Sequence, residues 1–326
     1  MIITRTPYRV SLFGGGSDYK CWYENHGGAV LSSTIDKYCH ISLRETPKFL
    51  GTKYRLFWSH IETVNKREDI KHPGVRGCLE YLGIDDGIEV IHAGDLPARS
   101  GVGSSSAFTV GMLHALHVLR GEHVGPRQLA NEAIRVEQDV LKETVGIQDQ
   151  IACSVGGFNH ITIRPDGGYS VAPVIVPPEV KTQLESRLML FFTGLQRNAS
   201  DIASAQVANS ELKSRELEAI AALVPKAVSC LANGDVSAFG SLLHETWMLK
   251  RELADGVSNP QIDDIYKRAM NTGAKGGKLL GAGSGGFMLF YVPVQSQPAV
   301  HEALKDLLEI PFKFGAEGSR VILYDP

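Results

Sequence analysis

Residues 96–107 read Leu-Pro-Ala-Arg-Ser-Gly-Val-Gly-Ser-Ser-Ser-Ala and run directly into a segment with helical periodicity, in which Phe108, Met112 and Leu116 share one face. The first backbone N–H groups of a helix have no intrahelical acceptor, and the helix dipole adds partial positive charge there. The small residues before this helix leave room for an anion. One serine would suffice as an ordinary N-cap, so three serines and two glycines favour a phosphate-binding loop.

Two more glycine clusters lie at junctions between predicted elements. Residues 14–16 follow a predicted strand over 9–13, and residues 281–286 connect predicted strands over 278–280 and 287–292. Glycine in a loop often serves only to form a turn, so a single cluster would be weak evidence. Three clusters predict that several backbone segments approach a ligand closely.

Two common nucleotide-binding motifs are excluded by the residues themselves. The nearest match to a Walker A motif ends at Lys278, but Leu279 stands where Ser or Thr is required and Thr272 where the first glycine is required. A G-x-G-x-x-G pattern lies within residues 281–286, but a predicted strand follows it where the dinucleotide-binding motif needs a helix.

Composition bounds the class of protein. The chain has 326 residues, of which 43% are hydrophobic and 21% charged, as in ordinary globular proteins. At roughly 150 residues per domain this length predicts two domains. The net charge of −3 gives no broad electropositive face, so nucleic acid and anionic membranes are not expected as partners.

The sequence also favours a reducing, cytoplasmic location. Its five cysteines are widely spaced and contain no C-x-x-C, which argues against a disulfide framework or a zinc site. Arg5 and Arg9 interrupt the first apolar stretch, which predicts a strand and not a signal peptide. The apolar runs at 188–192 and 287–292 are far shorter than the roughly 20 residues of a membrane-spanning helix.

The order of predicted elements divides the chain into two halves. Strands dominate the first third and helices follow, up to a segment at 173–179 that contains three prolines. We therefore expect one domain over 1–180 and a second over 181–326. The second half alternates a strand, a block of helices, two strands, a helix and a last strand over 320–324, which predicts an α+β layer of helices on a mixed sheet.

Two carboxylates stand where apolar or small residues surround them. Glu137 lies three residues after Ile134 and four before Leu141, on an otherwise apolar helix face. It is either a salt-bridged residue or a ligand for Mg²⁺, which prefers hard oxygen donors. Asp149 lies between two glutamines just after Gly146. It is either a residue stabilised by a helix N-terminus or a base for a substrate hydroxyl.

Asp18 and Asp36 follow the first glycine cluster and a predicted strand, respectively. An Asp beside a glycine loop can accept hydrogen bonds from sugar hydroxyls. Turn capping explains either residue equally well.

Together the three glycine loops resemble the three motifs of the GHMP kinase family, which includes galactokinase, homoserine kinase and mevalonate kinase. Residues 7–19 resemble motif 1, residues 96–107 the phosphate loop, and residues 278–287 motif 3. The resemblance implies a two-domain α+β fold. Residues 1–180 would form the half that is similar to ribosomal protein S5 domain 2, and residues 181–326 the ferredoxin-like half, with ATP and substrate between them.

The resemblance also implies roles for particular residues. Asp149 would be the catalytic Asp and Arg9 the cation beside it, while Ser106 (or Ser105) and Glu137 would bind Mg²⁺. The residues implied to bind ATP are Pro97, Arg99, Ser100, Gly101, Val102, Gly103, Ser104, Ser105 and Ser106. The residues implied to bind the substrate are Gly15, Gly16, Ser17, Asp18, Asp36, Gly194, Arg197 and Gly283.

Departures from the family pattern bear on the substrate. Galactokinases carry Glu-His after the glycine of motif 1, where this chain has residues 15–17, and homoserine kinases lack the Asp that is present here at 149. Residues 13–19 and 35–39 look most similar to the bacterial heptose 7-phosphate kinase branch, and residues 192–194 and 197–200 resemble both that branch and the fucokinase-like branch. We therefore expect an ATP- and Mg²⁺-dependent kinase that phosphorylates the anomeric hydroxyl of D-glycero-D-manno-heptose 7-phosphate, for nucleotide-activated heptose and surface polysaccharide (capsule or lipopolysaccharide) synthesis.

Three alternatives stay open at this point. The first is a fucose- or galactose-type 1-kinase that acts on an unphosphorylated sugar. The second is a non-catalytic regulator that binds sugar and ATP on the same fold, and the third, which motif 1 fits poorly, is a decarboxylase of a phosphorylated mevalonate. The sequence does not choose among the candidate cations for the 7-phosphate, which are Lys37, Arg44, His72, Arg76 and Arg197.

Overall fold

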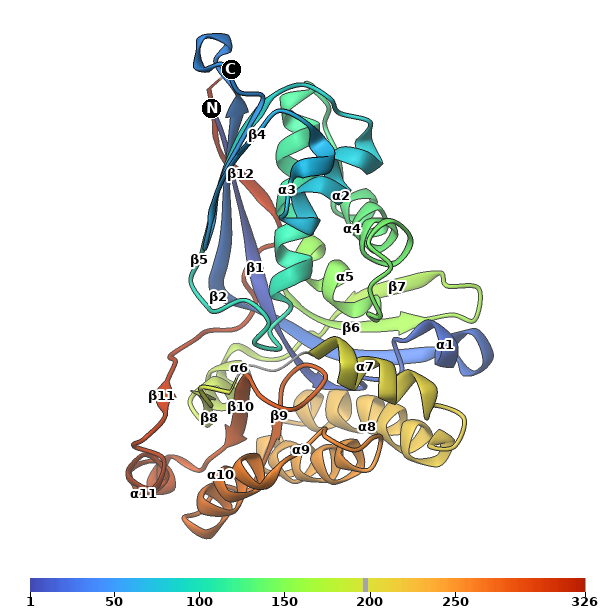
Figure 1. Ribbon diagram of the computed structural model, residues 1–326. Helices are drawn as coiled ribbons and strands as arrows, with labels where there is room; N and C mark the ends of the chain where they lie inside the picture. The colour runs from blue at the N-terminus through green and yellow to red at the C-terminus, as the bar shows by residue number, and fades with distance from the viewer. Residues whose placement is uncertain (196–198, 326) are drawn as a thin grey trace.

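The computed structural model describes residues 1–195 and 199–325, which form two β-sheets and the helices packed against them (Figure 1). The first sheet has eight strands in the order β12-β1-β2-β5-β3-β4, and β6 and β7 extend it from the other end of β2. Its strands are β1 (Ile2–Phe13), β2 (Gly28–Glu45), β3 (Tyr54–Phe57), β4 (Ile61–Val64), β5 (Ile88–Gly94), β6 (Phe158–Ile163), β7 (Tyr169–Pro173) and β12 (Arg320–Tyr324).

Helices of the first half cover one face of this sheet, as Figure 1 shows. Val10, Leu12 and Ile41 from the strands and Met112 and Leu116 from α3 are fully buried in the core between the two layers. The helices are α1 (Lys20–His26), α2 (Pro73–Leu82), α3 (Ser104–Leu119), α4 (Pro126–Arg135) and α5 (Gln148–Val155), and a π-helical turn, Val136–Val140, follows α4.

A smaller sheet organises the second half. Its strands β8 (Leu188–Phe192), β9 (Gly276–Leu279), β10 (Phe287–Tyr291) and β11 (Leu308–Glu309) pair in the order β11-β8-β10-β9, and every pair is antiparallel. The predicted mixed sheet is therefore wrong for this half. The helices are α6 (Pro178–Glu185), α7 (Ala199–Ala208), α8 (Ser214–Ala232), α9 (Val236–Arg251), α10 (Pro260–Asn271) and α11 (Gln297–Ala303).

The C-terminal strand does not join that smaller sheet. β12 pairs antiparallel with β1, so the last strand of the chain lies beside the first (Figure 1). Isolated bridges also join Ile35 to Phe314 and Gly156 to Glu317. The domain boundary at residue 180 stays a prediction. Residues 314–324 come after it in the sequence but include a strand and two bridges that pair with segments before it.

The two halves share one apolar core. Phe13, at the end of β1, meets Phe239 of α9 edge to face with the ring centroids 5.0 Å apart. Leu223 and Val224 of α8 and Leu243 of α9 are buried in the same cluster. This packing places α9 and the loop after β9 beside the end of β1. Within the described residues, no helix combines the length and the apolar character needed to cross a bilayer.

Candidate active site

The loop before α3 has the geometry of an anion-binding turn. Gly101 and Gly103 have φ angles of +82° and +72°, which L-side chains rarely adopt. A Cβ on Gly101 would lie 2.5 Å from the carbonyl oxygen of Leu280, so neither conformation nor space admits a side chain. The first helical bond runs from the N–H of Ala107 to the carbonyl of Gly103, which leaves the N–H groups of residues 104–106 without intrahelical acceptors.

Arg9 reaches this loop from β1. The pairing of β1 with β2 shifts between Pro7 and Arg9, and the N–H of Arg9 donates to the carbonyl of Val102 at 2.9 Å. Its Nη1 also donates to the carbonyl of Gly101 at 2.6 Å. Arg9 is 4% exposed, so the charge of its guanidinium needs a close partner.

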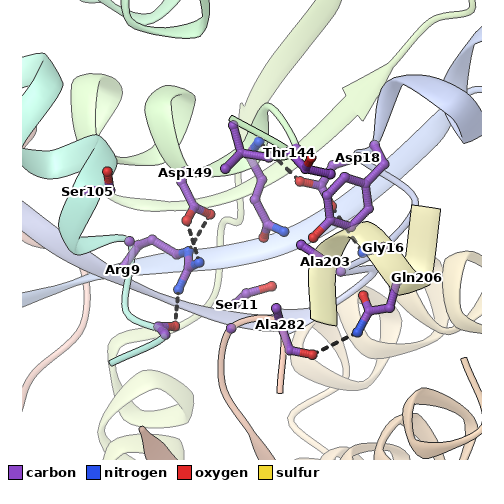
Figure 2. Close-up of a pocket in the computed structure, with 18 of the residues that line it drawn as sticks. Arg9, Ser11, Gly16, Asp18, Ser105, Thr144, Asp149, Ala203, Gln206 and Ala282 are labelled. Atoms are coloured by element: carbon purple, nitrogen blue, oxygen red, sulfur yellow. Dashed lines mark hydrogen bonds and ion pairs between the residues drawn. The ribbon is translucent and has the colours of Figure 1, made fainter. Parts of the chain in front are cut away.

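Asp149 supplies that partner from the first turn of α5. Arg9 Nε lies 2.7 Å from Oδ1 and Nη2 lies 2.6 Å from Oδ2, a bidentate pair that fixes the carboxylate plane. Burial opposes the charge of Arg9, but the contacts with Asp149 outweigh it and raise the pKa of the guanidinium. A Cβ on Gly103 would lie 3.5 Å from Asp149 Oδ2, so the carboxylate lies close to the phosphate loop. Figure 2 shows this pair at the wall of the cavity.

Ser106 and Glu137 lie behind the loop. Ser106 Oγ donates to Glu137 Oε2 at 2.9 Å, Gln150 Nε2 donates to the same oxygen at 2.5 Å, and Glu137 Oε1 has no partner among the described residues. Burial, followed by the charge of Glu143, raises the pKa of Glu137 to about 8.

A hydroxyl beside a buried carboxylate with one unpaired oxygen fits the hard-oxygen preference of Mg²⁺. The described residues contain no cluster of three His, Cys, Asp or Glu side chains that would hold a metal alone. Phosphate oxygens of the substrate would therefore have to complete the shell.

Asp18 lies across the cavity from Asp149 (Figure 2). Its Oδ1 accepts from the N–H of Gly16 at 3.0 Å and its Oδ2 from the N–H of Gln148 at 3.4 Å. Burial, followed by the negative charge of Asp149, raises the pKa of Asp18. Ser17 has a different place, because its Oγ donates to the carbonyls of Gly14 and Ala29 and holds the turn.

These elements enclose one cavity of about 490 Å³. Of the sequence-predicted residues, the structure brings Arg9, Gly15, Gly16, Asp18, Arg99, Gly101, Gly103, Ser104, Ser105 and Asp149 to its wall. Pro97, Ser100, Val102, Ser106 and Glu137 are not among the residues that line it. All their functional roles remain predictions.

The structure does not bring the remaining predicted substrate residues to this cavity. Asp36 accepts from the N–H of Lys313 at 2.8 Å in the connection to β12, away from this cavity, and its predicted contact with the substrate stays a prediction. Gly283 packs against Val257, and Gly194 is exposed. Arg197 lies outside the described residues.

None of the other predicted phosphate-binding cations lines the cavity. Arg44 pairs with Glu89, Lys37 lies against Asp36, and Arg76 donates to the carbonyl of Ile70. His72 accepts from the N–H of Val75 and stacks on Phe108, with the ring centroids 4.4 Å apart.

Two buried lysines that were not among these candidates line the cavity. Lys250 of α9 donates to the carbonyls of Leu279, at 2.9 Å, and Gly281, and Lys278 of β9 donates to the carbonyls of Ser11 and Leu12. The sequence signal for Lys250 was available, because it lies seven residues after Leu243 and three after Trp247 on a buried helix face. The same reasoning identified Glu137.

Comparison with known proteins identifies a family for the chain. The chain matches the model of the GHMP kinases N terminal domain over residues 73–157 and that of the GHMP kinases C terminal over residues 227–319. It is 30% identical over 329 aligned residues to the D-glycero-alpha-D-manno-heptose 7-phosphate kinase of Campylobacter jejuni, and the alignment covers 93% of each chain.

Solved structures share the fold over nearly the whole chain. The crystal structure of a D-glycero-D-manno-heptose 1-phosphate kinase from Bacteroides thetaiotaomicron superposes with a TM-score of 0.83 at 23% identity, covering 100% of both chains. A putative sugar kinase from Campylobacter jejuni gives a TM-score of 0.78 at 27% identity, covering 98% of this chain and 97% of that one.

Proposed function

Since the chain belongs to the GHMP kinase family and is a sugar kinase of that family, we propose that its acceptor is D-glycero-D-manno-heptose 7-phosphate. The reaction is transfer of the γ-phosphoryl group of ATP to the anomeric hydroxyl, which gives the 1,7-bisphosphate. A phosphate on the anomeric carbon is the group to which a nucleotide is attached when a sugar is activated. The activated heptose would then be used in the synthesis of surface polysaccharide.

The observation that carries the proposal is the position of Asp149. Its carboxylate is held by both nitrogens of the Arg9 fork, borders the loop that precedes α3, and faces Asp18 across the cavity. A carboxylate with a fixed plane can orient an acceptor hydroxyl and take its proton as the bond to phosphorus forms. Asp18 and the backbone at Gly16 offer groups for the other sugar hydroxyls.

The donor side is built from backbone. Phosphoryl transfer depends mainly on positioning and on stabilising charge that develops on the phosphate oxygens. The free N–H groups of residues 104–106 supply that stabilisation at the start of α3, and Arg9 adds positive charge. Ser106 and Glu137 would hold Mg²⁺, which neutralises phosphate charge when it is bound.

Two features support a heptose phosphate as acceptor. The relative with 93% coverage of both chains carries that activity in its name. The wall of the cavity also carries basic side chains beyond the Arg9–Asp149 pair, namely Lys250, Lys142 and Arg99, which suits an acceptor that already bears a phosphate.

A coupled ADP-release assay tests the proposal directly. The panel contains heptose 7-phosphate, the same heptose without its phosphate, mannose, fucose and galactose, each with ATP and Mg²⁺. We expect the highest kcat/KM with heptose 7-phosphate and a loss of at least tenfold when the phosphate is removed, because its charged contacts are worth more than about 1.4 kcal/mol. Faster turnover of fucose or galactose would overturn the assignment and leave a sugar 1-kinase of another specificity.

A further inference from the structure

Thr246 and Lys250 lie one turn apart on α9, and both face the cavity. Their side chains belong to the second half of the chain, opposite the motif 1 residues on β1. They are 2% and 7% exposed, respectively. Thr246 has no role above, and Lys250 has so far been counted only as one of several basic groups that line the cavity, although a threonine and a lysine are costly to bury without partners.

No carboxylate among the described residues contacts the ammonium of Lys250, although the charge of Asp18 is near enough to raise its pKa. Its Nζ donates to the carbonyls of Leu279, at 2.9 Å, and Gly281, which leaves one of the three N–H donors of an ammonium free. No ion pair within the described part of the chain includes Lys250. Burial, followed by the positive charge of Arg9, lowers the pKa of Lys250 to about 7. An anion bound in the cavity would stabilise the charged form of this lysine.

Thr246 lacks a hydrogen-bond partner in the same place. Its Oγ1 is buried and unpaired among the described residues, and so are Ser11 Oγ and Gln148 Oε1, which line the same cavity. These two residues are 5% and 8% exposed. A buried unpaired polar group costs about 1–3 kcal/mol, so three around one cavity indicate a polar ligand that pairs with them.

The location of Lys250 links it to the phosphate loop. The carbonyl that it holds belongs to Gly281, and a Cβ on Gly281 would lie 2.5 Å from the Cα of Gly101. Arg9 donates to the carbonyl of Gly101 from the other side. Lys250 and Arg9 thus each hold one of two glycines whose backbones are in contact.

We propose that Thr246 and Lys250 bind a phosphoryl group in this cavity, with Lys250 supplying a point charge and Thr246 a hydroxyl donor. The inference rests on the proposed kinase function, because both of its substrates carry phosphate. The group is either the γ-phosphoryl of ATP or the phosphate that the acceptor sugar already bears. Both sources present the same oxygens, and the experiment separates them.

Equilibrium binding by isothermal titration calorimetry tests the pair without requiring turnover. Wild type, Lys250→Gln and Thr246→Val are titrated with the ATP analogue AMPPNP, with ADP, with heptose 7-phosphate and with the unphosphorylated heptose. If the pair binds the γ-phosphoryl group, both variants weaken AMPPNP, about 10- to 100-fold for Lys250→Gln, and leave ADP unchanged. If it binds the phosphate of the acceptor, the same loss appears with heptose 7-phosphate and not with the unphosphorylated sugar.

A substitution series separates charge from tethering. Lys250→Gln keeps an N–H donor for the carbonyls of Leu279 and Gly281, whereas Lys250→Met removes both donor and charge. The proposal expects the glutamine and methionine variants to lose affinity alike. Lys226→Gln, an exposed lysine on the neighbouring α8, is the matched control and should bind every ligand as wild type does.

Two outcomes overturn the proposal. One is binding of all phosphorylated ligands within twofold of wild type by both Lys250→Gln and Thr246→Val. The other is wild-type affinity of Lys250→Gln with loss only in Lys250→Met, which would make Lys250 a structural tether. If wild type does not phosphorylate heptose 7-phosphate but the AMPPNP arm behaves as expected, the acceptor assignment fails and the phosphoryl-binding pair stands.

Discussion

Arg9 and Asp149 are 140 residues apart in sequence and form a bidentate ion pair at 2.7 and 2.6 Å. The pair joins β1 to the first turn of α5, and Arg9 Nη1 extends it to the carbonyl of Gly101 in the phosphate loop. One arginine therefore holds both the Asp149 carboxylate and the loop before α3, which under the proposed function would lie beside the acceptor and the donor. Catalysis by positioning requires that the groups which hold the two substrates are fixed relative to each other. A displacement of about 1 Å between the reacting groups is enough to slow the reaction strongly.

The first prediction concerns the charge of Asp149. Asp149→Asn keeps the size of the side chain and one acceptor for Arg9, but it cannot take a proton. Turnover should fall by about 10²- to 10⁴-fold, as is typical when a general base is removed. Steady-state kinetics with the best acceptor measures this, with thermal melting as the check on folding. Near-normal kcat in the variant would remove Asp149 from the chemical step.

The second prediction concerns backbone geometry in the phosphate loop. Gly101→Ala places a methyl group against the carbonyl of Leu280, at a residue whose φ is +82°. It should lower the free energy of unfolding by more than the roughly 1–2 kcal/mol expected from backbone strain alone, and it should weaken AMPPNP binding. Gly121→Ala is the matched control, since its φ is +72° and no atom lies within 4 Å of the new methyl. Calorimetry of both variants compares them, and equal AMPPNP affinities would contradict the prediction.

The third prediction concerns the pH dependence of activity through Lys250. Its pKa of about 7 means that the ammonium is charged below that pH and loses its charge above it. Arg9 faces it with like charge and Asp18 with opposite charge, while burial, followed by the charge of Lys250, lowers the pKa of the neighbouring Lys278 well below its usual value. In wild type, kcat/KM should therefore decline as the pH rises through about 7, because this parameter follows groups of the free enzyme. A pH profile of Lys250→Gln that shows the same declining limb would assign it to another group.

The fourth prediction concerns stability away from the site. His117 contacts Glu122 at 2.7 Å and Glu132 at 2.6 Å, and its hydrogen bond to Glu132, the largest favourable influence, raises its pKa above the usual 6.5. A pKa raised by folding stabilises the protein fully below 6.5, and the benefit is lost as the pH rises through the folded-state pKa. His117→Gln should therefore lower the unfolding free energy by about 1–3 kcal/mol at pH 5.5 and by less at pH 9. Denaturant titrations at the two pH values measure the difference, and an equal loss at both would contradict it.

The site was largely predictable where a residue type conflicts with its surroundings. Glu137 on an apolar helix line and the small residues before α3 are local conflicts that need no knowledge of the fold. Lys250 carries the same signal on α9, and its place beside Gly281 depends on the pairing of β9 with β10. Ser17 and Asp36 could not be assigned from sequence, because a polar side chain in a turn serves backbone and ligand equally well.

The fold was less predictable where distant segments pair. The strand over residues 320–324 was expected in the smaller sheet, but β12 pairs with β1 at the opposite end of the chain. Alternation of apolar and polar residues predicts that a segment is a strand, but it does not predict which other strand it pairs with. Pro225 is a residue that usually begins or ends a helix, yet it lies inside α8, where it is exposed and the helix continues past the missing N–H.

The most direct test of the account is a crystal structure of this protein with AMPPNP, Mg²⁺ and the acceptor sugar. The account predicts that the β- and γ-phosphates lie against the N–H groups of residues 104–106, with the anomeric hydroxyl between the γ-phosphorus and Asp149. A triphosphate bound away from residues 101–106, or an Asp149 carboxylate turned away from the acceptor hydroxyl, would contradict it.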